Sequence, residues 1–217
     1  MVHRARQLGA LLALAIASTV YADDGTALGK VRLPINPYRN AHVGEWATYV
    51  DKQHDDWETR TVKSVEGDAV TVCYVSKTGS DLTLDLHRRG SLSFHDLCPV
   101  REPAGFEATD VTTTDEAITI SGKTFQCKKV SFTWTKKDSP LTSTLAIWLT
   151  SEVKGGGFAR VTAHMEKKKN AIIIDEDKHE TSFDACFEVA GFGSADKTEW
   201  GETSEGIVKK LGASEPK

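Results

Sequence analysis

Apolar and polar residues alternate with a period of two along most of the chain. Val70, Val72 and Tyr74, for example, alternate with Thr71 and Cys73. The same period covers residues 82–87, 92–95, 130–134, 145–149 and 183–189. This period, in segments rich in Val, Thr, Phe and Trp, predicts strands that turn one face to a core and the other to solvent.

Short turn sequences separate these runs. Arg88-Arg89-Gly90 joins two of them, and Gly122-Lys123 forms a second turn that would pair Ile120 with Phe125. Strands joined by such turns are antiparallel neighbours, and a change of phase near Lys128-Lys129 predicts a bulge that bends the sheet. The predicted fold class is therefore mainly β: a curved antiparallel meander, half-barrel or barrel-like, with few or no long helices.

The N-terminal segment is typical of a secretory signal peptide. Arg4 and Arg6 precede an apolar stretch at residues 8–20, which ends in Val20-Tyr21-Ala22 with small residues at the cleavage positions. This stretch is shorter than the ~20 residues that span a bilayer. We expect cleavage after Ala22 and a mature protein in the periplasm or outside the cell, with no transmembrane segment.

The rest of the chain divides by composition into three parts. Residues 23–39 predict an extended lead-in, and residues 40–190, where the alternating runs lie, predict a single antiparallel β domain. Residues 191–217 are rich in Gly, Ser, Glu and Lys and poor in apolar residues, which favours a flexible polar tail.

The charge balance excludes one class of partner. The full chain carries 27 basic and 31 acidic residues, a net charge of -4. Loss of Arg4 and Arg6 with the signal peptide leaves 25 basic against 31 acidic residues, a net charge of -6. A protein with this balance lacks the basic field that holds nucleic acid.

Four cysteines remain in the mature chain. They are Cys73, Cys98, Cys127 and Cys186. In an oxidising compartment an even number predicts up to two disulfides, with the connectivity open. Four free buried thiols are the alternative. The absence of a Cys-x-x-Cys spacing argues against a redox pair or a zinc ribbon.

No catalytic, metal or cofactor motif survives inspection. Ser121-Gly122-Lys123-Thr124 resembles the end of a phosphate-binding loop, but Ala117 stands where the first glycine is required. Asp85, His87 and His95 suggest a metal site, yet the expected hairpin register separates the two imidazoles by roughly 13 Å at ~3.3 Å per residue. That separation is too great for zinc.

A curled sheet presents a concave apolar face that a helix, a second layer or a ligand must fill. The residues expected to line it are Leu84, Phe94, Phe132, Trp134 and Ile147. The same residues are equally consistent with a self-packed core.

The order of motifs resembles that of a group of uncharacterised exported bacterial β-rich proteins. The motifs are Val43-Gly44-Glu45-Trp46, Gly122-Lys123-Thr124-Phe125-Gln126-Cys127-Lys128-Lys129-Val130, Ile147-Trp148-Leu149-Thr150-Ser151-Glu152-Val153 and Gly155-Gly156-Gly157. The layout is also similar to the half-barrel of the periplasmic lipoprotein carriers, whose bent sheet cups a lipid. The resemblance implies an exported curved sheet.

Three functional hypotheses follow. The first is a non-enzymatic carrier or sensor that binds a lipid or other apolar small molecule on the concave face. The second is an envelope interaction module that meets another protein through exposed edges and loops such as residues 151–157. The third is a hydrolase with an unrecognised site, for which Asp85, His87 and His95 are the residues to test.

Overall fold

The computed structural model describes residues 26–77, 81–98, 105–136, 139, 141–167, 182–195 and 197–211. Within these residues the chain forms ten strands and three short helices. The elements are α2 (Ala27–Lys30), β1 (Trp46–Asp51), β2 (Asp56–Glu66), β3 (Ala69–Ser76), β4 (Asp81–His87), α3 (Phe94–Leu97), β5 (Phe106–Ile120), β6 (Lys123–Lys136), β7 (Leu141–Leu149), β8 (Phe158–Lys167), β9 (Ser182–Ser194), β10 (Lys197–Gly201) and α4 (Ser204–Lys210).

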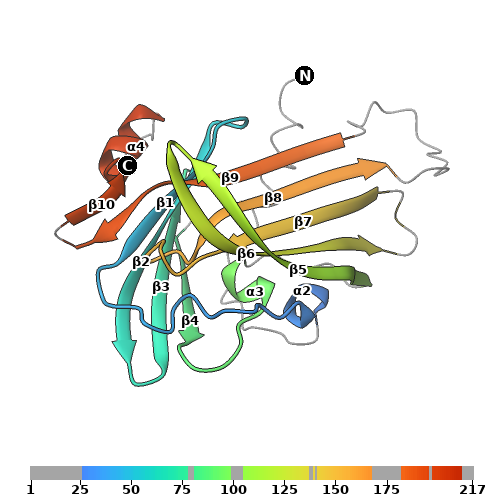
Figure 1. The fold of residues 1–217 in the computed structure, drawn as a ribbon, viewed down its shortest axis with the longest axis horizontal. Coiled ribbons are helices and arrows are strands. Elements are labelled where there is room, and N and C mark those ends of the chain that lie inside the picture. Colours follow the sequence, from blue (N-terminus) through green and yellow to red (C-terminus); the bar gives the residue numbers. More distant parts are fainter. Residues whose placement is uncertain are drawn as a thin grey trace.

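The strands form one antiparallel sheet that curls into a half-barrel (Figure 1). Its order is β4-β3-β2-β1-β9-β8-β7-β6-β5, and β10 pairs with β9 beside this path. Two meanders, β1–β4 and β5–β9, therefore meet where β1 pairs with β9. The predicted fold class is confirmed.

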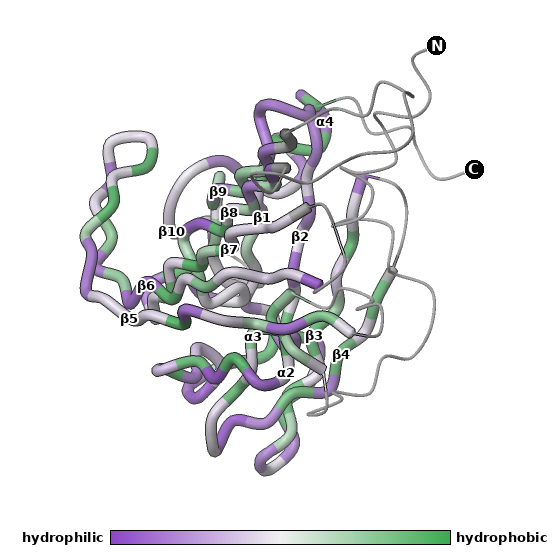
Figure 2. Tube along the Cα trace, turned by 90° about the vertical axis from the view of Figure 1, so that its right-hand side faces the viewer, coloured by the Kyte–Doolittle hydropathy of each residue, from purple (hydrophilic) through white to green (hydrophobic). Residues whose placement is uncertain are grey.

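The chain covers the concave face of its own sheet. In Figures 1 and 2, α2 and α3 lie close together beneath the long strands, and α2 contacts both α3 and β5. Main-chain hydrogen bonds tie the two covering segments, from Leu33 N to Leu92 O at 2.8 Å and from Phe94 N to Val31 O at 2.8 Å. The segment expected to be an extended lead-in is thus partly helical, and it packs on the sheet with the Leu28 side chain fully buried.

Residues 92–95 differ from the predicted strand. Residues 94–97 form α3, and Ser93 caps it: the Ser93 hydroxyl accepts from Asp96 N, and the Asp96 carboxylate accepts from Ser93 N. Such a reciprocal cap satisfies donors at the start of a helix. A local capping signal has overridden a short period-two pattern.

The C-terminal segment also differs from the flexible tail predicted over residues 191–217. Residues 197–201 form β10, and the ring of Trp200 packs edge-on against Phe125 at 5.4 Å. The glycines that indicated mobility instead let backbones approach closely, since a Cβ at Gly191 would lie 2.1 Å from the carbonyl oxygen of Glu202. Helix α4 then buries Ile207 against the outer face of β1 and β2.

No helix in the described part of the chain is long and apolar enough to cross a membrane. The predicted signal peptide and its cleavage site at Ala22 lie outside the described residues, as do residues 212–217.

Candidate functional site

The five residues predicted to line a ligand groove come together in the main hydrophobic cluster. Leu84, Phe94, Phe132 and Ile147 are buried in it, and Trp134 packs against it. The rings of Phe94 and Phe132 meet edge to face, 5.0 Å apart. In the structure these side chains therefore contact one another and the covering helix α3. A ligand on the concave face would have to displace that cover.

The four cysteines are free thiols, so the predicted disulfides are not supported by the structure. Cys73 is on β3, Cys127 on β6 and Cys186 on β9. In the sheet order, two strands lie between β3 and β9, and two lie between β9 and β6. At ~4.8 Å per strand, Cys186 is therefore about 14 Å from Cys73 and about 14 Å from Cys127. A disulfide needs Cα atoms within about 7 Å. Cys98 is buried beyond α3.

A buried cation lies inside the half-barrel. Only 2% of Arg60 is exposed, and its Nε and Nη2 atoms contact the Glu58 carboxylate at 2.8 and 2.6 Å. The guanidinium also lies over the rings of Tyr74 and Phe158, each at 4.5 Å. Burial raises the pKa of the Tyr74 hydroxyl well above its ordinary value even though the nearby arginine opposes the shift. The cluster is therefore a buried cation stacked on aromatic rings, with its counter-charge at the edge of the cluster.

Two buried tyrosines join this cluster to the triple-glycine loop between β7 and β8. The Tyr49 hydroxyl donates to Phe158 O at 3.0 Å, and the Tyr38 hydroxyl donates to Gly155 O at 3.3 Å. A Cβ on Gly156 would lie 1.8 Å from the Tyr49 hydroxyl oxygen. The loop can pack this closely against Tyr49 only because residue 156 is glycine.

An open basin of about 860 Å³ lies beside this loop. Three segments that are distant in sequence form it: residues 33–45, the β4–α3 loop at residues 88–91, and the β7–β8 loop at residues 151–154. Its lining residues are Leu33, Pro34, Ile35, Asn36, Pro37, Arg39, Asn40, His42, Glu45, Arg88, Arg89, Gly90, Ser91, Ser151 and Lys154.

Asn36 braces one side of the basin. Its amide nitrogen lies within hydrogen-bond distance of three carbonyl oxygens, those of His87 at 2.7 Å, Arg88 at 3.2 Å and Gly90 at 3.3 Å. The Arg88 guanidinium donates in turn to the Arg39 carbonyl oxygen at 3.2 Å. The loop that carries two arginines is thus held against the covering segment.

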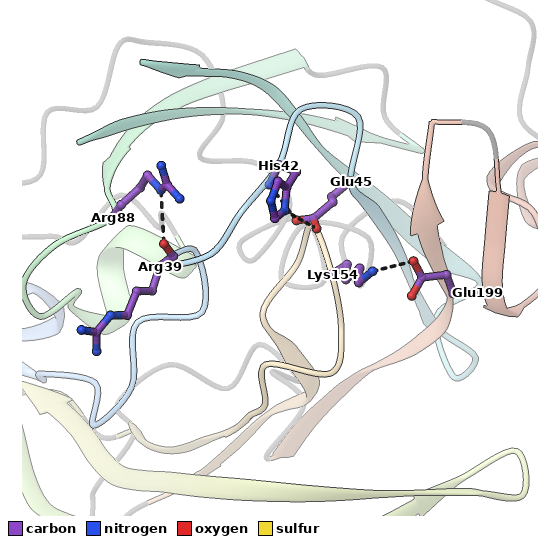
Figure 3. Close-up of polar contacts among 6 residues, drawn as sticks. All are labelled: Arg39, His42, Glu45, Arg88, Lys154 and Glu199. Carbon is purple, nitrogen blue, oxygen red and sulfur yellow. Dashed lines mark hydrogen bonds and ion pairs between the residues drawn. The ribbon is translucent and has the colours of Figure 1, made fainter. Parts of the chain in front are cut away.

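Cationic side chains outnumber acidic ones along the lining of the basin, in a chain whose net charge is -4. Four lining side chains carry a permanent positive charge, against one carboxylate. Figure 3 shows Arg39 and Arg88 to one side of His42 and Glu45, and Lys154 to the other side with its partner Glu199. His42 Nδ1 contacts the buried Glu45 carboxylate at 3.3 Å. An excess of cationic donors around an open space suits an acidic ligand.

Sequence reasoning interpreted Arg88-Arg89-Gly90 only as a turn. Gly90 does have a positive φ, 92°, but residues 88–91 lead from β4 into α3, so the predicted hairpin between two strands is wrong. The two adjacent arginines were the one feature of the sequence that could have indicated a cationic site. They indicate one only together with Arg39 and Lys154, which line the same basin from other segments.

The three residues weighed for metal or hydrolytic chemistry do not converge. His87 and Asp85 are exposed on β4, where the Asp85 carboxylate accepts from the Thr71 hydroxyl at 2.7 Å. His95 is buried on α3. Among the described residues, no group of three His, Cys, Asp or Glu side chains is placed to hold a metal ion.

No protein-family model matches the chain, and a search of curated proteins finds no match. Among solved structures, the chain is similar to the hypothetical protein CT021 from Chlamydia trachomatis, with a TM-score of 0.40 and 8% identity. The alignment covers 77% of this chain and 95% of the chlamydial one. The resemblance to the lipoprotein carriers stays a prediction.

Proposed function

We propose that the chain is an exported, non-enzymatic binding module whose ligand is a small molecule with an acidic group and an apolar portion. The ligand occupies the basin beside the triple-glycine loop. The observation that carries this proposal is the excess of cationic side chains around an open space of about 860 Å³ in an acidic protein.

The acidic group is the part of the ligand that the basin recognises by charge. Arg39 and Arg88 come from the same side of the basin, and their guanidinium groups point apart in Figure 3. Each guanidinium can donate two parallel hydrogen bonds to a carboxylate or phosphate. Lys154 supplies a further positive charge from the other side. Asn36 holds the Arg88 loop in place, which lowers the ordering cost of binding.

The apolar portion follows from the covering segment. Pro34, Ile35 and Pro37 line the same basin, and each is at least partly exposed there. We therefore propose that the apolar part of the ligand binds in the basin and not on the concave face of the sheet. On the concave face, the side chains expected to meet a lipid already pack against each other and α3.

Two considerations favour a binding module over the alternative hypotheses. The residues weighed for hydrolysis do not meet in one place. The loop at residues 151–157, weighed as a protein-docking surface, has its three glycines buried against the body of the half-barrel. In particular, a Cβ on Gly155 would meet Trp46 backbone atoms at 2.5 Å, and one on Gly157 would meet Pro37 at 2.2 Å.

Titration calorimetry with three probes tests the proposal. Dodecyl phosphate carries both features of the ligand, inorganic phosphate carries only the acid, and dodecyl maltoside carries only the apolar chain. We expect dodecyl phosphate to bind most tightly. We expect Arg88→Gln to weaken it by about tenfold, as for loss of one charge-assisted contact.

Lys63→Gln is the matched control, because it removes one positive charge from an exposed position on β2 outside the basin. It should leave the affinity for dodecyl phosphate unchanged. Equal affinity for dodecyl maltoside and dodecyl phosphate, or equal losses in Arg88→Gln and Lys63→Gln, would overturn the proposal.

A further inference from the structure

We propose that Glu199 is a built-in competitor for the acidic group of the ligand. Its carboxylate pairs with Lys154, and the ligand must displace it to reach that lysine. This inference rests on the proposed function and concerns the regulation of the same basin.

The contact between the two side chains is direct. Lys154 Nζ donates to Glu199 Oε1 at 2.6 Å, and Figure 3 shows the pair at one side of the basin. The Lys154 side chain is 41% exposed and that of Glu199 28%, so solvent and a ligand reach both. The hydrogen bond from Lys154 to Glu199 raises the pKa of the lysine, which keeps it charged.

The backbone of β10 explains why Glu199 is the residue that faces Lys154. Thr198 pairs with Gly193 and Trp200 pairs with Phe192, so two steps along β10 match one step along β9. Glu199 is the extra residue at this irregularity. A bulge redirects the side chain of its extra residue and releases it from the regular ladder. Here the bulge is followed by Trp200, which anchors β10 on Phe125.

The energetics allow exchange. An ion pair between partly exposed groups contributes little to stability, because water solvates both partners when they separate. A phosphate or carboxylate that also contacts the arginines at the other side of the basin can therefore replace Glu199 at Lys154. The affinity of the basin is then set by the competition between the ligand and Glu199.

The test compares dodecyl phosphate affinities by calorimetry in the full chain. Glu199→Gln should raise the affinity about two- to fivefold, the range expected for release of an exposed ion pair. Lys154→Gln should lower it. In the double variant the gain from Glu199→Gln should vanish, because the lysine for which Glu199 competes is gone.

Glu202→Gln provides the matched control. It removes the same charge three residues away, where Glu202 pairs with Lys210 at 2.6 Å and does not line the basin. An equal gain in Glu202→Gln, or a gain that persists without Lys154, would reveal a general charge effect and overturn the competition.

The remaining outcomes separate this inference from the proposed function. If Arg88→Gln weakens binding and Glu199→Gln has no effect, the basin binds the ligand without competition, and only this inference falls. If neither the unaltered chain nor Glu199→Gln binds dodecyl phosphate, both fall. Binding by Glu199→Gln alone would support both.

Discussion

Arg60 and Glu58 lie two residues apart on β2, and two nitrogens of the arginine contact one carboxylate oxygen of the glutamate, at 2.8 and 2.6 Å. The arginine is almost completely buried, whereas 25% of the Glu58 side chain is exposed. The cation thus depends for its neutralisation on a partner at the edge of the cluster. Because Arg60 is buried and Glu58 is partly exposed, loss of the glutamate should affect stability more than loss of both charges together.

Removal of Glu58 should destabilise the protein. Glu58→Ala leaves the Arg60 guanidinium buried among rings without a counter-charge, and we expect the free energy of unfolding to fall by about 2–4 kcal/mol. Urea denaturation followed by tryptophan fluorescence measures this change. Arg60→Met combined with Glu58→Met removes both charges and should recover most of the loss. A Glu58→Ala variant as stable as the parent would contradict this account.

Gly156 should tolerate no side chain. An added Cβ would lie 1.8 Å from the Tyr49 hydroxyl oxygen and 2.8 Å from Ala47 Cβ, so the loop or the tyrosine must move. We expect Gly156→Ala to lower the free energy of unfolding by about 3 kcal/mol, as overpacking of a buried site does.

Gly67→Ala separates this overpacking from the effect of losing a glycine. Gly67 lies in the β2–β3 turn with φ 59°, and nothing lies within 4 Å of an added Cβ. Its only cost is left-handed backbone strain, about 1 kcal/mol. Equal melting temperatures for the two alanine variants would show that Tyr49 and the loop move apart freely.

The strands were predictable because each pattern was local. The period of two in residues 130–134 and 145–149 required only that one face be buried, and the structure pairs Val130 with Ile147 in that way. The register of the strand pairs was predicted less accurately. The sequence suggested that Ile120 pairs with Phe125, but the turn falls on Ser121-Gly122, both at positive φ, and Ile120 pairs with Lys123.

The candidate site was not predictable, because it depends on tertiary neighbours. Arg88 becomes part of a basin only when Asn36 holds its loop against the covering segment. The packing of β10 likewise depends on Phe125, which lies far away in sequence but supplies the surface on which Trp200 docks. Neither relationship leaves a periodic trace in the chain.

The thiols offer a direct test of the cysteine assignment. Burial raises the pKa of both Cys98 and Cys127 to about 11, so little reactive thiolate exists at neutral pH. We expect both to resist iodoacetamide at pH 8 until urea unfolds the chain, and all four cysteines then to react without prior reduction. An intact mass two hydrogens below the reduced value would instead indicate a disulfide.

His164 should give the outer face of β8 a distinct pH response. Its Nδ1 contacts the Asp184 carboxylate at 2.5 Å across the β8–β9 pair, and Glu166 lies 3.7 Å from its Nε2. The hydrogen bond to Asp184 is the main cause of a pKa raised above the ordinary 6.5, and the charges of both carboxylates add to it. The folded protein therefore favours the protonated imidazole.

The sign of the stability effect follows from that direction. A histidine whose pKa is higher in the folded than in the unfolded state adds stability below the unfolded pKa and loses it as pH rises through the folded one. Asp184→Asn should therefore lower the free energy of unfolding more at pH 5.5 than at pH 8.5, and lower the pKa of His164 in an NMR titration. Asp68→Asn, beside His87 at 3.6 Å, is the control and should leave His164 unchanged. A His164 titration that is the same with and without Asp184 would show that the contact carries no charge coupling in solution.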